Sequence, residues 1–197
     1  MSLRNNDLRY GTVAAAFHWV IAAVIIFQLW LGLYMGELPR SDPNQFALVQ
    51  LHKSIGLTIL VLTVLRILWR FANRVPPLPA TMGPILKALA RTSHFLLYVL
   101  MLAIPLSGWA MTSASALGLP IRYFGLFDWP KIWFLADMTR EERRPIGQAF
   151  GEVHEILAFS LIALLIIHVS AALLHQFVYR DNVLRRMIPG VRIKEPV

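Results

Sequence analysis

Four long apolar stretches alternate with polar segments along this chain, roughly at residues 13–35, 50–71, 93–112 and 150–178. Each stretch is close to the roughly 20 residues that an α-helix needs to cross about 30 Å of hydrocarbon. The segments between them carry proline, glycine and charged residues, which are typical of the loops that connect such helices. The pattern predicts an all-α fold, a bundle of four transmembrane helices, and a single integral membrane domain over residues 1–197.

The composition favours the same class of protein. Apolar residues make up 57% of the chain and the mean hydropathy is +0.58, above what soluble domains usually show. We expect the first stretch to be a retained helix, because it is too long for the apolar core of a cleaved signal peptide. The chain contains no cysteine, which excludes disulfides, thiolate metal sites, iron–sulfur clusters and covalently attached c-type haem. Any redox metal must therefore be held by histidine, methionine or oxygen.

The positive charges are unevenly placed, within a net charge of +8. Most lie near the two ends of the chain and between the second and third stretches. They are Arg4, Arg9, Arg70, Arg74, Lys87, Arg91, Arg180, Arg185, Arg186, Arg192 and Lys194. Because segments rich in Lys and Arg stay on the cytoplasmic side, we expect both termini in the cytoplasm. The same rule accounts for the high isoelectric point, so no nucleic-acid partner is predicted.

Histidines inside the apolar stretches are the candidate functional residues. An ionisable residue in a membrane helix is a functional candidate by default. A lone histidine can also serve only to form a hydrogen bond between two helices. His154 and His168 are separated by about 21 Å along a helix and return to within about 40° of the same face. His52 opens the second helix on the outer side, as His154 opens the fourth, and His18 lies near the level of His168. The sequence therefore predicts an outer pair, His52 with His154, and an inner pair, His18 with His168.

Small residues one helical turn away would give each of these histidines room for a flat porphyrin; Gly56 does so for His52. Such residues are also common wherever membrane helices pack closely. Two imidazoles per site would fill both axial positions of an iron porphyrin, which is typical of an electron carrier. Zinc is the competing metal, but it would need four tetrahedral ligands at each site, and only Glu155 is available at these depths. Haem b fits better.

Two further histidines are expected outside the ligand set. His94 has the bulky Tyr98 one turn away, so we interpret it as a residue beside the cofactor or a quinone. His175 should lie at the level of the lipid headgroups.

Short motifs around the histidines and at the helix ends follow one another along nearly the whole chain. They are FHW at 17–19, LHKSIG at 51–56, RILWR at 66–70, SHFLLYVLMLAIPLSGW at 93–109, GEVHEILA at 151–158, IIHVSAALLHQF at 166–177 and DNVLRRM at 181–187. In this combination they resemble the bacterial cytochrome b561 family, which is related to the cytochrome b subunits of nickel–iron hydrogenases. The resemblance implies an inner-membrane bundle with two b haems, one near each face, and His18, His52, His154 and His168 as axial ligands.

One member type of this family is a superoxide oxidase, so the resemblance implies a superoxide:ubiquinone oxidoreductase that takes electrons from a periplasmic donor. Lys53 directly follows His52, and with Arg40 and Lys131 it would form a positive funnel that steers an anion. Lys53 could instead pair with a haem propionate. On the inner side, Arg66 and Arg70 are candidate partners of haem propionates or lipid phosphates.

Two other functions have to be considered, and the sequence offers one candidate quinone site. The chain could be a membrane-anchor subunit that passes electrons between a partner dehydrogenase or hydrogenase and quinone, with segment 113–149 as the docking surface. That segment is rich in aromatic residues, which are typical of the membrane interface. A proton or metal transporter is disfavoured, because the first three apolar stretches contain no carboxylate. His94, Tyr98 and Trp19 form one candidate quinone site near the inner pair.

Overall fold

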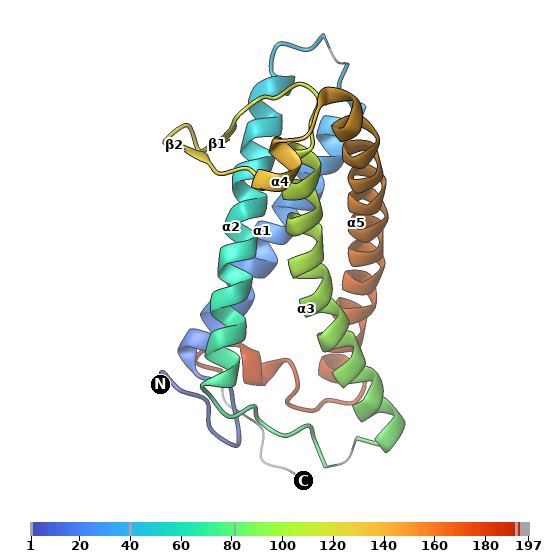
Figure 1. The fold of residues 1–197 in the computed structure, drawn as a ribbon. Coiled ribbons are helices and arrows are strands. Elements are labelled where there is room, and N and C mark those ends of the chain that lie inside the picture. The colour runs from blue at the N-terminus through green and yellow to red at the C-terminus, as the bar shows by residue number, and fades with distance from the viewer. Residues whose placement is uncertain (1, 40, 81, 192, 194–197) are drawn as a thin grey trace. The chain divides into compact units, whose positions relative to one another are not determined.

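Four long helices dominate the computed structural model, which describes residues 2–39, 41–80, 82–191 and 193. They are α1 (Thr12–Glu37), α2 (Gln45–Phe71), α3 (Pro84–Ser113) and α5 (Arg140–Phe177), shown in Figure 1. Each is long and apolar enough to cross a membrane, which confirms the predicted all-α fold with four spanning helices. Only 6% to 33% of the most apolar segment of each helix is buried inside the protein. Most apolar side chains therefore point outward, as contact with lipid requires.

The helices α3 and α5 begin well before the apolar stretches that predicted them. Pro84 opens α3, a first-turn position at which proline loses no helical hydrogen bond. Thr139 and Glu142 form a capping box before α5, in which the Thr139 N–H donates to the Glu142 carboxylate at 2.9 Å and the Glu142 N–H to Thr139 Oγ1 at 3.4 Å. Pro105 lies inside α3 without ending it. Hydropathy marks the membrane segment of a helix and misses its polar extensions.

The chain divides into two compact units. Unit 1 consists of Met1–Ala22, Leu62–Val99 and Leu161–Val197, and unit 2 consists of Ala23–Val61 and Leu100–Ser160. Each of the four long helices contributes one segment to each unit.

In unit 1, hydrogen bonds from side chains to the backbone tie the ends of the chain to neighbouring loops. The side-chain amide of Asn5 donates to the Arg74 carbonyl at 2.7 Å, and the indole N–H of Trp19 donates to the Met187 carbonyl at 2.8 Å. The predicted charges of Arg192 and Lys194 lie outside the described residues, as does that of Arg40 in unit 2.

Unit 2 contains a small antiparallel hairpin that the sequence did not predict. Its strands are β1 (Ile121–Tyr123) and β2 (Phe127–Trp129), paired so that Ile121 faces Trp129 and Tyr123 faces Phe127. A short helix, α4 (Trp133–Ala136), follows. Leu135 of α4 packs with Ala110 and Ala114 in a buried apolar cluster.

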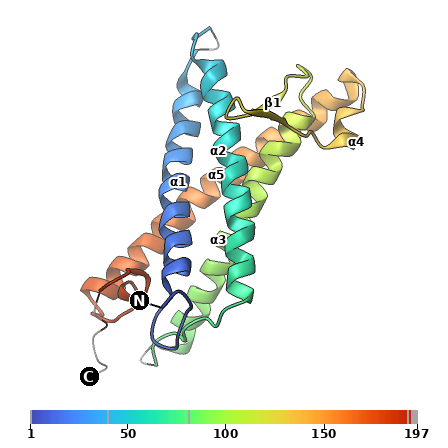
Figure 2. The ribbon, with the colours of Figure 1, turned by 90° about the vertical axis from the view of Figure 1, so that its left-hand side faces the viewer.

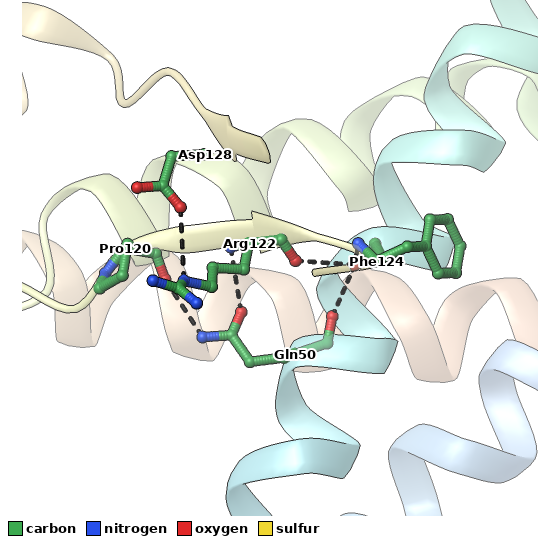
Figure 3. Close-up of polar contacts among 6 residues, drawn as sticks. Gln50, Pro120, Arg122, Phe124 and Asp128 are labelled. Carbon is green, nitrogen blue, oxygen red and sulfur yellow. Dashed lines mark hydrogen bonds and ion pairs between the residues drawn. The ribbon is translucent and has the colours of Figure 1, made fainter. Parts of the chain in front are cut away.

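The hairpin lies against α2, as Figures 1 and 2 show from two sides. Gln50 of α2 accepts a hydrogen bond from the Arg122 N–H at 3.3 Å and donates one to the Pro120 carbonyl at 3.2 Å. One turn later, the Ser54 hydroxyl donates to the Arg122 carbonyl at 3.1 Å and accepts from the Phe124 N–H at 2.9 Å (Figure 3). These contacts satisfy the backbone of β1 on its open edge.

Candidate functional site

Unit 2 brings together the two histidines of the predicted outer pair. His52 lies on α2 and His154 on α5, and both side chains are partly buried. Their ring centres are 6.2 Å apart and the ring planes are 74° to one another. Two helices that are distant in the sequence therefore present imidazoles to the same small space.

The orientation of the His154 ring is set by α3. Its Nδ1 lies 2.9 Å from the Ile104 carbonyl and 3.1 Å from the Ser107 hydroxyl, which itself donates to that carbonyl at 2.8 Å. A carbonyl can only accept, so Nδ1 of His154 carries the proton and Nε2 keeps its lone pair. This is the arrangement that metal-binding histidines commonly show, with one nitrogen held by a carbonyl and the other free for the metal.

Two glycines that sequence reasoning missed allow both rings to sit this close to neighbouring helices. A Cβ added to Gly32 of α1 would lie 3.1 Å from Cε1 of His52, and one added to Gly108 of α3 would lie 3.1 Å from Cε1 of His154. Both distances are shorter than ordinary van der Waals contacts, so any larger residue would displace the ring. The SGW motif contained Gly108, but nothing in the local pattern linked it to a histidine on another helix.

Around His52 the polar contacts are fewer. Its Nδ1 is buried and has no hydrogen-bond partner among the described residues. The Gln28 amide donates to the backbone carbonyl of His52 at 2.8 Å, and a Cβ on Gly56 would meet that same amide at 3.4 Å. Gln28 therefore borders the space beside Gly56. The expectation that this space has room for a porphyrin stays a prediction.

Unit 1 brings together the predicted inner pair, His18 of α1 and His168 of α5. The ring centres are 6.3 Å apart and the ring planes are 61° to one another. Arg66 reaches His18, with 3.1 Å between Nη2 and Nδ1. The guanidinium groups of Arg66 and Arg70 both lie over the ring of Tyr98, at 5.4 Å and 5.6 Å from its centre. The two arginines expected to bind an anion are thus gathered beside the inner pair.

The Arg66 contact makes the inner pair different from the outer one. Because a guanidinium only donates hydrogen bonds, Nδ1 of His18 accepts in this arrangement. A neutral imidazole that binds a metal through Nε2 carries its proton on Nδ1 and cannot accept there. Metal binding by His18 through Nε2 therefore requires Arg66 to leave Nδ1.

The spacing within the two pairs matches a metal ion held between facing imidazoles. A ring nitrogen lies about 1.1 Å from its ring centre and a metal–imidazole bond is about 2 Å long, so two axial imidazoles have centres about 6.2 Å apart. The observed separations are 6.2 Å and 6.3 Å. The residues present therefore fit an iron porphyrin held by two histidines, although rings in direct edge contact also show centre separations in this range.

His94 does not fit as a third ligand of this kind. Its ring centre is 5.5 Å from that of His168, closer than two imidazoles on opposite sides of one metal ion would lie. Its Nδ1 lies 2.7 Å from the carbonyl of Ala90, one turn earlier on α3. His94 thus lies next to the inner pair, and its role beside the cofactor or a quinone stays a prediction.

A tetrahedral zinc site finds no support in the side chains. In the part of the chain that the structure describes, no three His, Cys, Asp or Glu side chains gather closely enough to hold a metal ion. Zinc would need such a group, whereas an iron porphyrin takes only two ligands from the protein.

Lys53 and Lys131 are neighbours in unit 2. Lys53 directly follows His52 and is partly buried, and Lys131 is near enough for the two charges to repel one another. Lys131 also donates a hydrogen bond to the Gly118 carbonyl at 2.7 Å, which fixes its position. Arg40, the third predicted charge, lies outside the described residues.

His175 has a partner that the sequence did not suggest. Its Nδ1 is 2.5 Å from a carboxylate oxygen of Asp181, just beyond the end of α5. The other carboxylate oxygen accepts from the Val183 N–H at 2.9 Å. This pair helps to hold the chain where it leaves the helix.

Comparison with known proteins settles the class of this chain. The sequence profile of the family described as prokaryotic cytochrome b561 matches residues 9–190. The chain belongs to the prokaryotic cytochrome b561 family. It is 38% identical over 189 residues to cytochrome b561 homolog 2 of Escherichia coli K12, with 95% of each chain covered. It is also 28% identical over 185 residues to a Yersinia pestis protein named probable superoxide oxidase CybB, covering 93% of this chain and 98% of that one.

Membership confirms the resemblance seen in the motifs. This cytochrome b561 is a bacterial membrane protein whose family binds haem b and transfers electrons. A further relative, 29% identical over 184 residues, is cytochrome b562 of Cereibacter sphaeroides, with 91% of this chain and 94% of that one covered.

Proposed function

We propose that this cytochrome binds two haem b groups and transfers electrons from superoxide to ubiquinone. His52 and His154 would hold one haem in unit 2, and His18 and His168 the other in unit 1. The observation that carries the proposal is the equal spacing of the two imidazole pairs, 6.2 Å and 6.3 Å. Each spacing suits one metal ion and two axial bonds.

A bound haem b supplies a one-electron iron couple. The protein's part would be to hold each haem through two histidine imidazoles from two different helices. The bond from His154 Nδ1 to the Ile104 carbonyl fixes the ring and makes the imidazole a stronger base. Arg66 and Arg70 lie beside the inner pair and would bind haem propionates once Arg66 leaves His18.

Superoxide as the donor is supported by the charge beside the outer pair and by the name of one relative. Lys53 directly follows His52 in α2, and Lys131 adds a second positive charge near Lys53. An anion is drawn to such a site, and dissolved salt weakens the attraction. The positive-inside rule assigns both termini to the cytoplasm and therefore these lysines to the outer side. Each superoxide would give up one electron and leave as dioxygen, and two such electrons, with two protons from water, would convert one ubiquinone to ubiquinol.

Ubiquinone as the acceptor is supported by donors beside the inner pair. His94 is exposed, and its Nε2 remains available because Nδ1 bonds to Ala90. Tyr98 is the neighbouring hydroxyl donor on the same helix. Trp19 already donates its indole N–H to Met187, so it would pack against the quinone ring without a hydrogen bond.

The test uses the purified haem-loaded chain in vesicles that contain ubiquinone and no other protein. Superoxide is generated outside, and its loss and the formation of ubiquinol are measured together. The proposal predicts ubiquinol in proportion to superoxide removed, and none with the His52→Ala, His154→Ala double variant. A haem-loaded chain that forms no ubiquinol without a second protein would favour the membrane-anchor alternative.

A further inference from the structure

The hairpin of unit 2 has an apolar tip next to a charged flank. Residues 123–127 read YFGLF and carry no charge. Leu126 is 78% exposed, Phe127 51% and Phe124 48%. Immediately behind them, Arg122 and Asp128 face one another across the strands with 3.6 Å between their charged atoms. Large apolar side chains are thus grouped at the end of the hairpin that extends away from its charges.

The tip is a defined structure. The Leu126 N–H donates to the Tyr123 carbonyl at 2.9 Å and closes the turn. Phe124 and Gly125 both have positive φ, 49° and 74°, a region that glycine adopts freely and phenylalanine rarely does. A bulky aromatic residue is therefore held in a strained position where a small polar residue would suit a turn in water.

The contacts with α2 set the depth of the hairpin. Gln50 and Ser54 bind the backbone of β1, and the Thr58 hydroxyl lies 3.0 Å from the Tyr123 hydroxyl. From Gln50 to Thr58 the axis of α2 advances by about 12 Å. The hairpin therefore lies alongside the spanning part of α2, and it stands out to the side of that helix (Figure 1).

We propose that residues 123–127 insert between lipid molecules of the membrane that α2 spans, in the leaflet on the Gln45 side of α2. Lipid is the occupant that the surroundings favour, because α2, against which the hairpin packs, also exposes apolar side chains, with Val61 44% exposed. The charges of Arg122 and Asp128 would remain at the level of the headgroups, where aromatic side chains such as Trp129 are also common. The hairpin would then be a lateral anchor that keeps β1 pressed against α2 beside His52.

The absence of cysteine from the chain allows a clean test. A single Leu126→Cys variant carries one environment-sensitive NBD fluorophore, and the haem-loaded full chain is reconstituted in vesicles of phosphatidylethanolamine and phosphatidylglycerol. Quenching is measured with a lipid that bears a nitroxide near the top of its acyl chain and, separately, with aqueous iodide. For each variant, the fluorescence intensity with quencher is divided by the intensity without it. Quenching by haem is the same in both measurements and therefore cancels.

Matched controls define the two environments. Val61→Cys reports the lipid-facing side of α2, and Asp128→Cys reports the charged flank of the same hairpin. The proposal predicts that the label at Leu126 is quenched by the nitroxide lipid at least as strongly as the label at Val61. It also predicts iodide quenching several-fold weaker than at Asp128. Phe127→Cys gives a second reading if Leu126→Cys fails to load haem.

Two results would overturn the proposal. Iodide quenching at Leu126 equal to that at Asp128 would place the tip in water. Protection from both quenchers would mean that protein covers the tip, either a second copy or a redox partner.

Discussion

Replacing Gly108 with alanine should alter one haem site without unfolding the protein. The added Cβ would lie 3.1 Å from Cε1 and 3.3 Å from Nδ1 of His154, so the ring must move by a few tenths of an ångström. Nδ1 is the atom that donates to the Ile104 carbonyl at 2.9 Å. The helix α3 itself should not suffer, since alanine is the better helix former by about 1 kcal/mol.

The displaced ring should raise the midpoint potential of the haem in unit 2. A carbonyl bound to the imidazole N–H makes the ligand a stronger base and stabilises ferric iron, and weakening that bond removes part of the effect. A loss of about 0.5–1 kcal/mol, within the range of a neutral hydrogen bond, corresponds to a rise of about 20–40 mV at about 59 mV per tenfold change in a one-electron equilibrium.

The assay is a potentiometric titration of the haem absorbance, resolved into its components. One component should shift in Gly108→Ala and the other should stay in place. Gly36→Ala is the matched control, because a Cβ there meets no heavy atom within 4 Å. Unchanged components in Gly108→Ala, or an equal shift in Gly36→Ala, would refute the link between the glycine and the ring.

Three further outcomes are expected. His94→Ala should retain the full haem content by pyridine haemochrome assay, since its ring centre lies 5.5 Å from that of His168, closer than two imidazoles on opposite sides of one metal ion would lie; loss of haem would make His94 a ligand. Lys53→Gln should lower the superoxide-dependent reduction rate, and the loss should be larger at low salt than at high salt because dissolved salt weakens the attraction between Lys53 and the anion; an equal loss at both salt concentrations would show that Lys53 does not steer superoxide. Trp19→Phe should lower the free energy of unfolding by about 0.5–1.5 kcal/mol in thermal melts, through the lost bond to Met187; an unchanged melting temperature would show that this tie contributes nothing.

The two histidine pairs could be predicted from the sequence because depth in a membrane follows from position along a helix. His52 and His154 each stand near the start of an apolar stretch, and His18 and His168 are expected at a common depth in the bilayer. Length and hydropathy were enough to predict four spanning helices. Neither could supply the separation of the rings, which depends on how closely the helix backbones approach.

The features that escaped prediction depend on contacts between distant segments. Gly32 and Gly108 matter because each faces a histidine of another helix. A periodic pattern within one helix does not indicate such a contact. The strands of the hairpin have three residues each, too few for an alternating pattern to be recognised. Their position comes from Gln50 and Ser54, polar residues that looked like ordinary members of a helix.

The pairing of the histidines is tested most directly by counting haems in double variants. The pyridine haemochrome assay should find two haems per chain in the unmodified protein. The within-pair variant His52→Ala, His154→Ala should retain one haem, and the cross-pair variant His52→Ala, His168→Ala should retain none. A cross-pair variant that kept a full haem, or a within-pair variant that lost both while remaining folded, would contradict the assignment of the four ligands.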